Sequence, residues 1–212
     1  NEIPNIYKIE FANGGIDIAT FKTVNTIFAN TLTNQETISL INSYINVTPL
    51  TTIYSKIITE KLNADPTADI NVVLTESKNL TVSAFDITNI NEINLDFIEN
   101  MNVNALKTNI KINTVINAIA RLVSVDLVSY TTNDVISSIT NYIISGAGKT
   151  FFNQLNNTNI TTFISFISSS LSSVTTTNIT NIINYICGSI NNNNNSNFKY
   201  LAEELYSLSA TT

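Results

Sequence analysis

The chain has 212 residues, of which 43% are hydrophobic and only 12% are charged, and its net charge is -6. It contains no histidine and one cysteine, which excludes a Ser-His-Asp or Cys-His triad, a Cys/His metal site and an internal disulfide. The acidic balance argues against nucleic acid as a partner. We therefore expect a protein that is not an enzyme and that uses no cofactor, metal or small-molecule substrate.

The N-terminal part of the chain predicts one strand followed by helices. Residues 6–11 alternate between two faces, and Asn13-Gly14-Gly15 is a turn signal that ends the strand. Apolar side chains at helical spacing then predict three helices, over residues 20–28, 34–45 and 53–62. Pro66 ends the third of them.

The clearest β signal comes next. Residues 70–75 and 80–87 have the pattern of two strands around Ser77-Lys78-Asn79, which predicts a β-hairpin at about 70–87. Further on, a long helix is expected over 103–123, with its inward positions at Leu106, Ile110, Ile116, Ile119 and Val123.

The remainder is helical by pattern. Thr132-Asn133-Asp134 is a start signal for a helix over 134–145. Apolar stripes predict three more helical faces, over 160–174, 179–186 and 197–208. The sequence thus predicts a mainly α multi-helix bundle with one short β-hairpin. We expect a single domain over 1–212, with two helical halves joined near 88–102 as the alternative.

Gly148-Lys149-Thr150 ends a segment, IISGAGKT, that raises the question of a nucleotide-binding P-loop. The first glycine of that motif is replaced by Ile143, the preceding residues have helical spacing, and no acidic residue lies between Asp134 and Glu203 to hold Mg²⁺. A helix C-terminus is the favoured interpretation, with Gly146 or Gly148 in a left-handed conformation.

Few other residues are candidates for a site. Asp86, Glu92, Asp96 and Glu99 form the densest acidic group, either a loose Ca²⁺ or acid/base site or, as we favour, a solvated face. Asp65 and Asp69 are expected to be loop acids. Cys187 is expected to be a small buried hydrophobe, with an intermolecular disulfide as the alternative. None of these is predicted to be catalytic, to bind a cofactor or to ligate a metal.

The C-terminal third is poor in charge and rich in hydroxyl and amide side chains. No charged residue lies between Lys149 and Lys199, and the run Asn191–Asn195 has the composition of a flexible loop. Its segment SFISSSLSSVTTTNITNIINYICGSI resembles the helical domains of spider silk proteins, with Ser-rich helices and one cysteine near a helix end. The resemblance covers 130–212 and implies an extracellular building block of a fibre or shell.

These features predict a structural protein that self-associates. Low surface charge removes a barrier to packing copies against each other. The expected partner is a second copy of the chain, in an extracellular or surface-associated fibre, sheath or shell. Two alternatives remain open: a secreted pore-forming or membrane-active toxin, the only interpretation in which a membrane is a partner, and a viral capsid or occlusion component.

Overall fold

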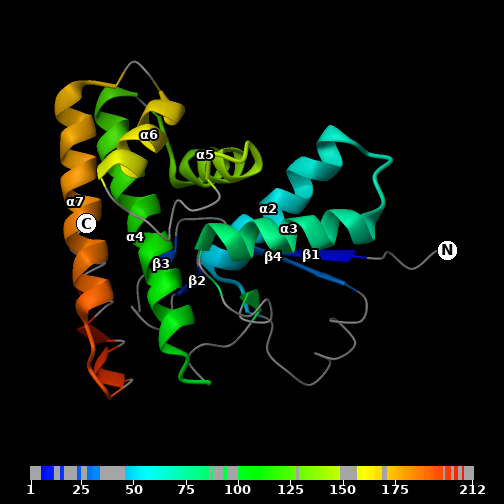
Figure 1. The fold of residues 1–212 in the computed structure, drawn as a ribbon, viewed down its shortest axis with the longest axis horizontal. Helices are drawn as coiled ribbons and strands as arrows, with labels where there is room; N and C mark the ends of the chain where they lie inside the picture. Colours follow the sequence, from blue (N-terminus) through cyan, green and yellow to red (C-terminus); the bar gives the residue numbers. More distant parts are fainter. Residues whose placement is uncertain are drawn as a thin grey trace.

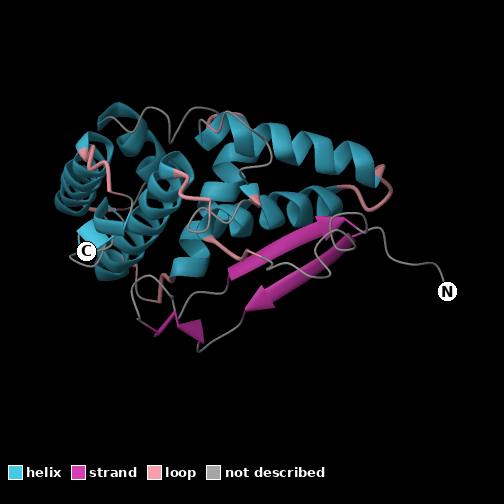
Figure 2. Cartoon of the chain, turned by 90° about the horizontal axis from the view of Figure 1, so that it is seen from below, coloured by secondary structure: helices cyan, strands magenta, loops and turns pink. Residues whose placement is uncertain are grey.

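The protein is a mainly helical molecule with a short β-sheet on one side (Figures 1 and 2). The computed structural model describes residues 6–11, 15–16, 23–24, 28–33, 46–85, 87, 93–94, 100–127, 129–148, 157–168, 171–197, 199–201, 203–204 and 207. The helix predicted over 34–45 and most of the junction near 88–102 lie outside these residues.

Two antiparallel strands form the sheet. β1 (Ile6–Phe11) pairs with β4 (Phe28–Thr33) in a register that places Ile9 opposite Asn30. Two shorter strands, β2 (Gly15–Ile16) and β3 (Thr23–Val24), pair with each other. The predicted first strand is confirmed.

The helix predicted over 20–28 is wrong, because its described residues belong to β3 and β4. β4, which begins at the end of the predicted helix, is held by tertiary contacts. Thr31 is buried and shares a 2.6 Å hydrogen bond with Ser55, and Asn30 donates to the carbonyl of Asn46 at 2.7 Å. Partners this far along the chain leave no trace in the spacing of apolar residues.

The third predicted helix is confirmed as α2 (Pro49–Ala64). Its first turn explains where it begins: the Thr48 side chain accepts from the Thr51 backbone, Thr51 bonds back to Thr48, and Pro49 occupies a position at which a missing N–H costs nothing. The helix ends just before Asp65-Pro66.

The predicted hairpin at 70–87 is wrong in place, because this segment is helix α3 (Ile70–Phe85). Its buried stripe is Val73, Ser77, Thr81 and Ala84, at helical spacing. Two of those positions are polar, so the remaining apolar residues imitate a strand. The predicted mainly helical class with one short antiparallel β-pair is confirmed, but the pair is formed by β1 and β4.

Helices α4 (Val103–Asp126) and α5 (Thr132–Ile144) match their predictions closely. All five inward positions predicted for α4 are at most 2% exposed. Thr131 and Asp134 form a reciprocal capping box at the start of α5, with the Thr131 N–H donating to the carboxylate of Asp134 at 2.7 Å.

The predicted continuous face over 160–174 divides into two helices, α6 (Asn157–Ile167) and α7 (Ser173–Asn192). Ser172 caps α7 by accepting from the Thr175 N–H at 3.1 Å. Val174 consequently lies on the surface instead of in the core. Of the last predicted helix, residues 199–201, 203–204 and 207 are described and helical, and Leu201 is buried.

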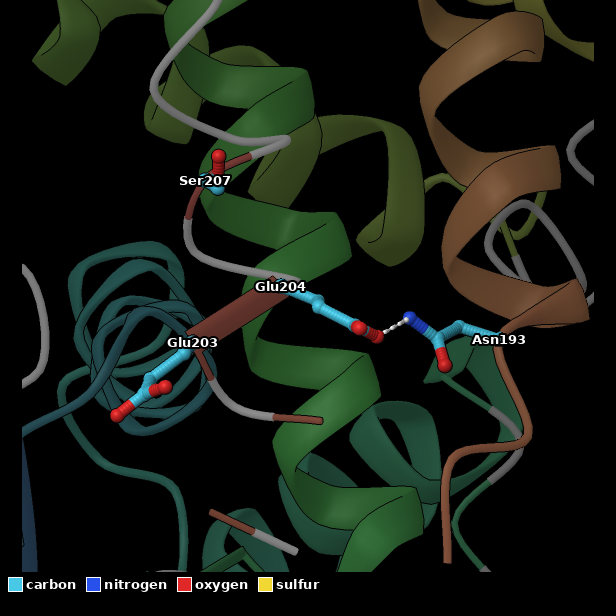
Figure 3. Close-up of a pocket in the computed structure, with 4 residues that line it drawn as sticks. All are labelled: Asn193, Glu203, Glu204 and Ser207. Atoms are coloured by element: carbon cyan, nitrogen blue, oxygen red, sulfur yellow. Dashed lines mark hydrogen bonds between the residues drawn. The ribbon is translucent and has the colours of Figure 1, made fainter. Parts of the chain in front are cut away.

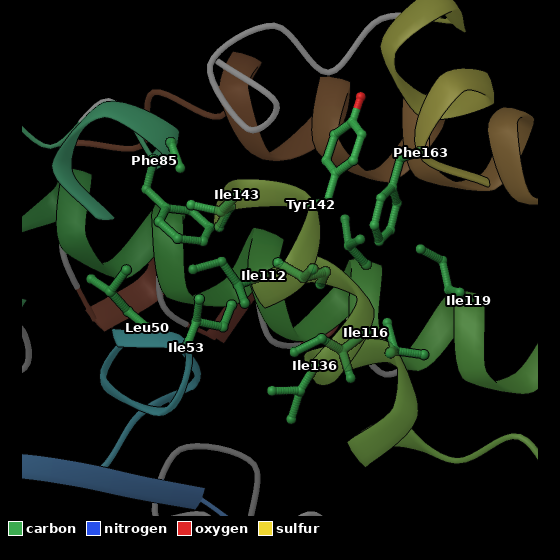
Figure 4. Close-up of a cluster of buried hydrophobic side chains, with 14 of the residues drawn as sticks. Leu50, Ile53, Phe85, Ile112, Ile116, Ile119, Ile136, Tyr142, Ile143 and Phe163 are labelled. Carbon is green, nitrogen blue, oxygen red and sulfur yellow. The ribbon is translucent and has the colours of Figure 1, made fainter. Parts of the chain in front are cut away.

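One main core connects α2, α3, α4, α5, α6 and α7 (Figure 4). The rings of Tyr142 and Phe163 lie 5.2 Å apart within it, in a tilted arrangement. A smaller apolar cluster joins the start of α4 to the end of α7, through Leu106, Ile110, Ile186, Ile190 and Leu201. These two clusters fix α4 and α7 side by side.

Candidate functional site

Gly146 and Gly148, which come just before Lys149 and Thr150, follow the end of a helix. Gly146 has φ 83°, in the left-handed region that glycine tolerates, and the Gly148 N–H donates to the Tyr142 carbonyl at 2.9 Å. A Cβ at Gly148 would lie 2.9 Å from the Cα of Ile143. The segment before the glycines is helix α5 and not the strand of a P-loop. Lys149 and Thr150 lie outside the described residues.

The acidic candidates offer no assembled site. Asp86, Glu92, Asp96 and Glu99 all lie outside the described residues. Asp65 and Asp69 act locally: a hydrogen bond from the Thr67 hydroxyl, then one from its N–H, lowers the pKa of Asp65, and Asp69 accepts from the Asn71 N–H at 2.8 Å. In the described part of the chain, no three His, Cys, Asp or Glu residues are placed to hold a metal.

Cys187 is buried as predicted. Loss of hydration raises the pKa of its thiol to about 12, against a small opposing effect of Lys111. A thiol in this state is scarcely ionised at neutral pH and is shielded from reagents. In the folded chain Cys187 is therefore a packing residue.

The run Asn191–Asn195 is ordered by hydrogen bonds. The Lys107 ammonium donates to the carbonyls of Asn191 at 3.2 Å and Asn193 at 2.6 Å, at the end of α7 where cations are favoured. The Asn193 side chain also donates to Glu204 at 2.8 Å and accepts from the Asn195 N–H at 3.1 Å. Successive turns of this kind are what asparagine side chains form readily.

A hollow beside Asn193 is lined by Glu203, Glu204 and Ser207 (Figure 3). The two carboxylates point in different directions, Glu204 toward Asn193 and Glu203 away from it. Among the described residues that line the hollow, the two carboxylates therefore do not converge on one point.

Hydroxyl side chains bond mainly to their own helices. Among the described residues, ten Ser or Thr hydroxyls donate to the carbonyl four residues earlier: Thr52, Thr59, Thr75, Thr81, Ser137, Thr140, Thr162, Ser165, Thr180 and Ser189. Such bonds occupy the donor and leave the threonine methyl group to meet the surroundings. The outer faces of these helices are thus less hydrophilic than their composition indicates.

One surface stands out from this neutral background. We call it the α4–α7 face: Ala118, Arg121, Leu122 and Val125 of α4 with Val174, Asn181, Ile182 and Tyr185 of α7. Much of it forms an open groove of about 530 Å³. Val125, Val174 and Tyr185 are 73%, 67% and 72% exposed.

The α4–α7 face lies at one end of the molecule, where α7 packs mainly on α4 and α6 (Figure 1). Arg121 is its single charged residue, because α7 contains none over its 20 residues. Such a face can dock against another neutral, apolar surface. Sequence reasoning does not find it, because apolar spacing places Val174 in the core and leaves Val125 and Tyr185 outside the main stripes.

Comparison with protein families, curated proteins and solved structures finds no match to this chain. The resemblance to spider silk domains therefore stays an expectation from the sequence. Among the described helices, none is both long enough and apolar enough to cross a membrane.

Proposed function

We propose that this chain is a non-catalytic structural subunit that self-associates, through the α4–α7 face, into an extracellular fibre, sheath or shell. The observation that carries the proposal is the outer surface of α7, a 20-residue helix without a charged side chain that exposes Val174 and Tyr185. Large exposed apolar side chains grouped on one face are typical of association surfaces.

The chemistry of the face favours a copy of the chain over a charged partner. The polar residues along α7 are amides and hydroxyls, and Arg121 of α4 is the one charged residue of the face, so two such faces meet with little like-charge repulsion and bury no carboxylates. On the exposed side of α7 the Ser189 hydroxyl already bonds to its own helix, at 2.9 Å, so its proton has a partner before any contact forms.

The test compares three proteins by sedimentation velocity across concentration. The wild-type chain is expected to form larger species as its concentration rises. The double variant Val174→Lys, Tyr185→Lys adds two positive charges to the face of each copy. We expect its association constant to fall by at least about tenfold.

The matched control is Val72→Lys on α3, which is 52% exposed and lies away from the α4–α7 face. It adds a charge at an exposed apolar position and should leave association unchanged. A wild-type chain that stays monomeric at millimolar concentration would refute the proposal. Release of dye from lipid vesicles by the monomer would instead favour the membrane-active alternative.

A further inference from the structure

Within the part of the chain that the structure describes, no strand pairs with the outer edge of β1. Among the described residues, β1 pairs only with β4, and α2 occupies the other edge of β4. There the Ala29 N–H donates to the Thr52 hydroxyl at 3.0 Å, and the Ala29 carbonyl accepts from the Thr51 hydroxyl at 2.9 Å. Figure 2 shows β4 next to the helices and β1 on its far side.

The side chains of β1 are unusually exposed for a strand. Phe11 is 58% exposed and Tyr7 is 36% exposed, although both are aromatic. Lys8 and Glu10, on the opposite face of the strand, form a surface ion pair with each other. An open edge with exposed aromatic residues is a template for another strand.

The sequence of β1 is complementary to itself. Antiparallel pairing of two copies about Ile9 places Lys8 of each copy opposite Glu10 of the other. The same register sets Tyr7 opposite Phe11, and Ile9 opposite Ile9. Opposite charges and aromatic pairs are the directly facing combinations that stabilise antiparallel strands.

We propose that two copies of this chain join through their β1 strands, antiparallel and centred on Ile9, into a four-stranded sheet in the order β4-β1-β1-β4. The backbone groups of the open edge then gain partners, and the exposed rings of Tyr7 and Phe11 cover one another. Lys8 and Glu10 together favour this register, because each faces an opposite charge only when the pairing is centred on Ile9.

This pairing deepens the proposed self-association and rests on it in taking a second copy as the partner. The β1 contact is two-fold symmetric and closes on itself, so alone it gives a dimer. The α4–α7 face lies on different elements of the chain. A dimer joined through β1 has two such faces, and further contacts through them extend the assembly beyond two copies.

Charge exchange tests the register. Lys8→Glu places two glutamates opposite each other in both pairs of the symmetric dimer, and Glu10→Lys places two lysines opposite each other. Each variant alone should dimerise about tenfold more weakly than wild type. An equimolar mixture of the two variants should recover dimers, since every glutamate then faces a lysine of the other chain.

The mixture separates pairing between chains from the ion pair within one chain, because neither variant regains that internal pair on mixing. Measurements use the Val174→Lys, Tyr185→Lys background, so that contacts through the α4–α7 face do not contribute. Two results would overturn this inference. One is that each single variant dimerises as strongly as the background protein. The other is that the equimolar mixture dimerises no more strongly than either variant alone.

A second readout uses a disulfide. Ile9→Cys in a Cys187→Ser background should form a covalent dimer under mild oxidation, because the two-fold axis passes beside residue 9. Tyr7→Cys should not, since its two copies are separated by about 13 Å along the strands. If the wild-type chain assembles but Ile9→Cys and Tyr7→Cys form covalent dimers to the same extent, the β1 inference is wrong and the proposed function is unaffected. If the wild-type chain stays monomeric, both the β1 inference and the proposed function are wrong.

Discussion

Replacing Thr114 by valine should stabilise the protein. The Thr114 side chain lies in α4 and is 0% exposed, and its hydroxyl has no hydrogen-bond partner among the residues that the structure describes. A buried hydroxyl without a partner costs about 1–3 kcal/mol. Valine has nearly the same shape and a similar helix propensity, so the change removes the polar atom with little repacking.

Thr140 provides the matched comparison. It is also 0% exposed and helical, but its hydroxyl donates to the Ile136 carbonyl at 2.8 Å. Thr140→Val loses a satisfied hydrogen bond worth about 0.5–1.5 kcal/mol and gains about 0.8 kcal/mol from the extra buried methyl group. We expect Thr114→Val to raise the free energy of unfolding by about 1–2 kcal/mol and Thr140→Val to leave it level or lower it slightly.

Urea denaturation followed by circular dichroism measures both changes, at a protein concentration low enough to exclude association. Each kcal/mol should also move the thermal midpoint by about 2–4 °C in a chain of this size. A Thr114→Val protein that is no more stable than Thr140→Val would refute the reasoning, because it would mean that the Thr114 hydroxyl is not buried without a partner.

Three further expectations concern the ends of helices and the cysteine. Gly148→Ala should destabilise the fold by about 1–3 kcal/mol, because the added Cβ meets the Ile143 backbone at 2.9 Å. Gly188→Ala should stabilise α7 by about 0.5–1 kcal/mol, because no atom lies within 4 Å of the added Cβ. Shifts of the urea midpoint in the same direction for both variants would contradict this contrast. Asp134→Ala should lower the free energy of unfolding at pH 7 and have little effect in acid, because hydrogen bonds lower the pKa of Asp134 in the folded chain. The contribution of Asp134 is complete above its unfolded pKa of about 3.9 and is lost as the pH falls through its folded pKa. A loss of stability that is as large at low pH as at pH 7 would count against this expectation. Cys187 should react with a thiol reagent at about pH 8 only after denaturant is added, and rapid labelling of the native chain would show that the thiol is accessible.

The parts of the fold that sequence analysis predicts correctly are those whose signals are local. α4 has a regular apolar stripe, and α5 has a capping pair within three residues, Thr131 and Asp134. The strand over Ile6–Phe11 is predicted from alternating side chains, and the turn signal at Asn13-Gly14-Gly15 follows it directly. In each case the segment's own side chains define its structure, and no distant partner is needed to recognise it.

The errors occur where polar residues are buried. In α3 the core positions Ser77 and Thr81 break the apolar stripe, and the remaining valines and leucines resemble a hairpin. In β4, the Asn30 amide nitrogen donates to a partner 16 residues away, and the Thr31 hydroxyl bonds to one 24 residues away. The α4–α7 face escapes prediction for a related reason: it is defined by how two helices lie side by side, which no single stripe encodes.

Hydrogen bonds join helices α4 and α7 near both ends of the pair. Lys107 holds the carbonyl of Asn193 at one end, and Asp126 accepts from the Ser172 N–H at 2.9 Å at the other. Between these two fasteners the 24 residues of α4 form a bar about 36 Å long. A load applied along this bar would therefore be shared by two helices, because they are joined near both ends.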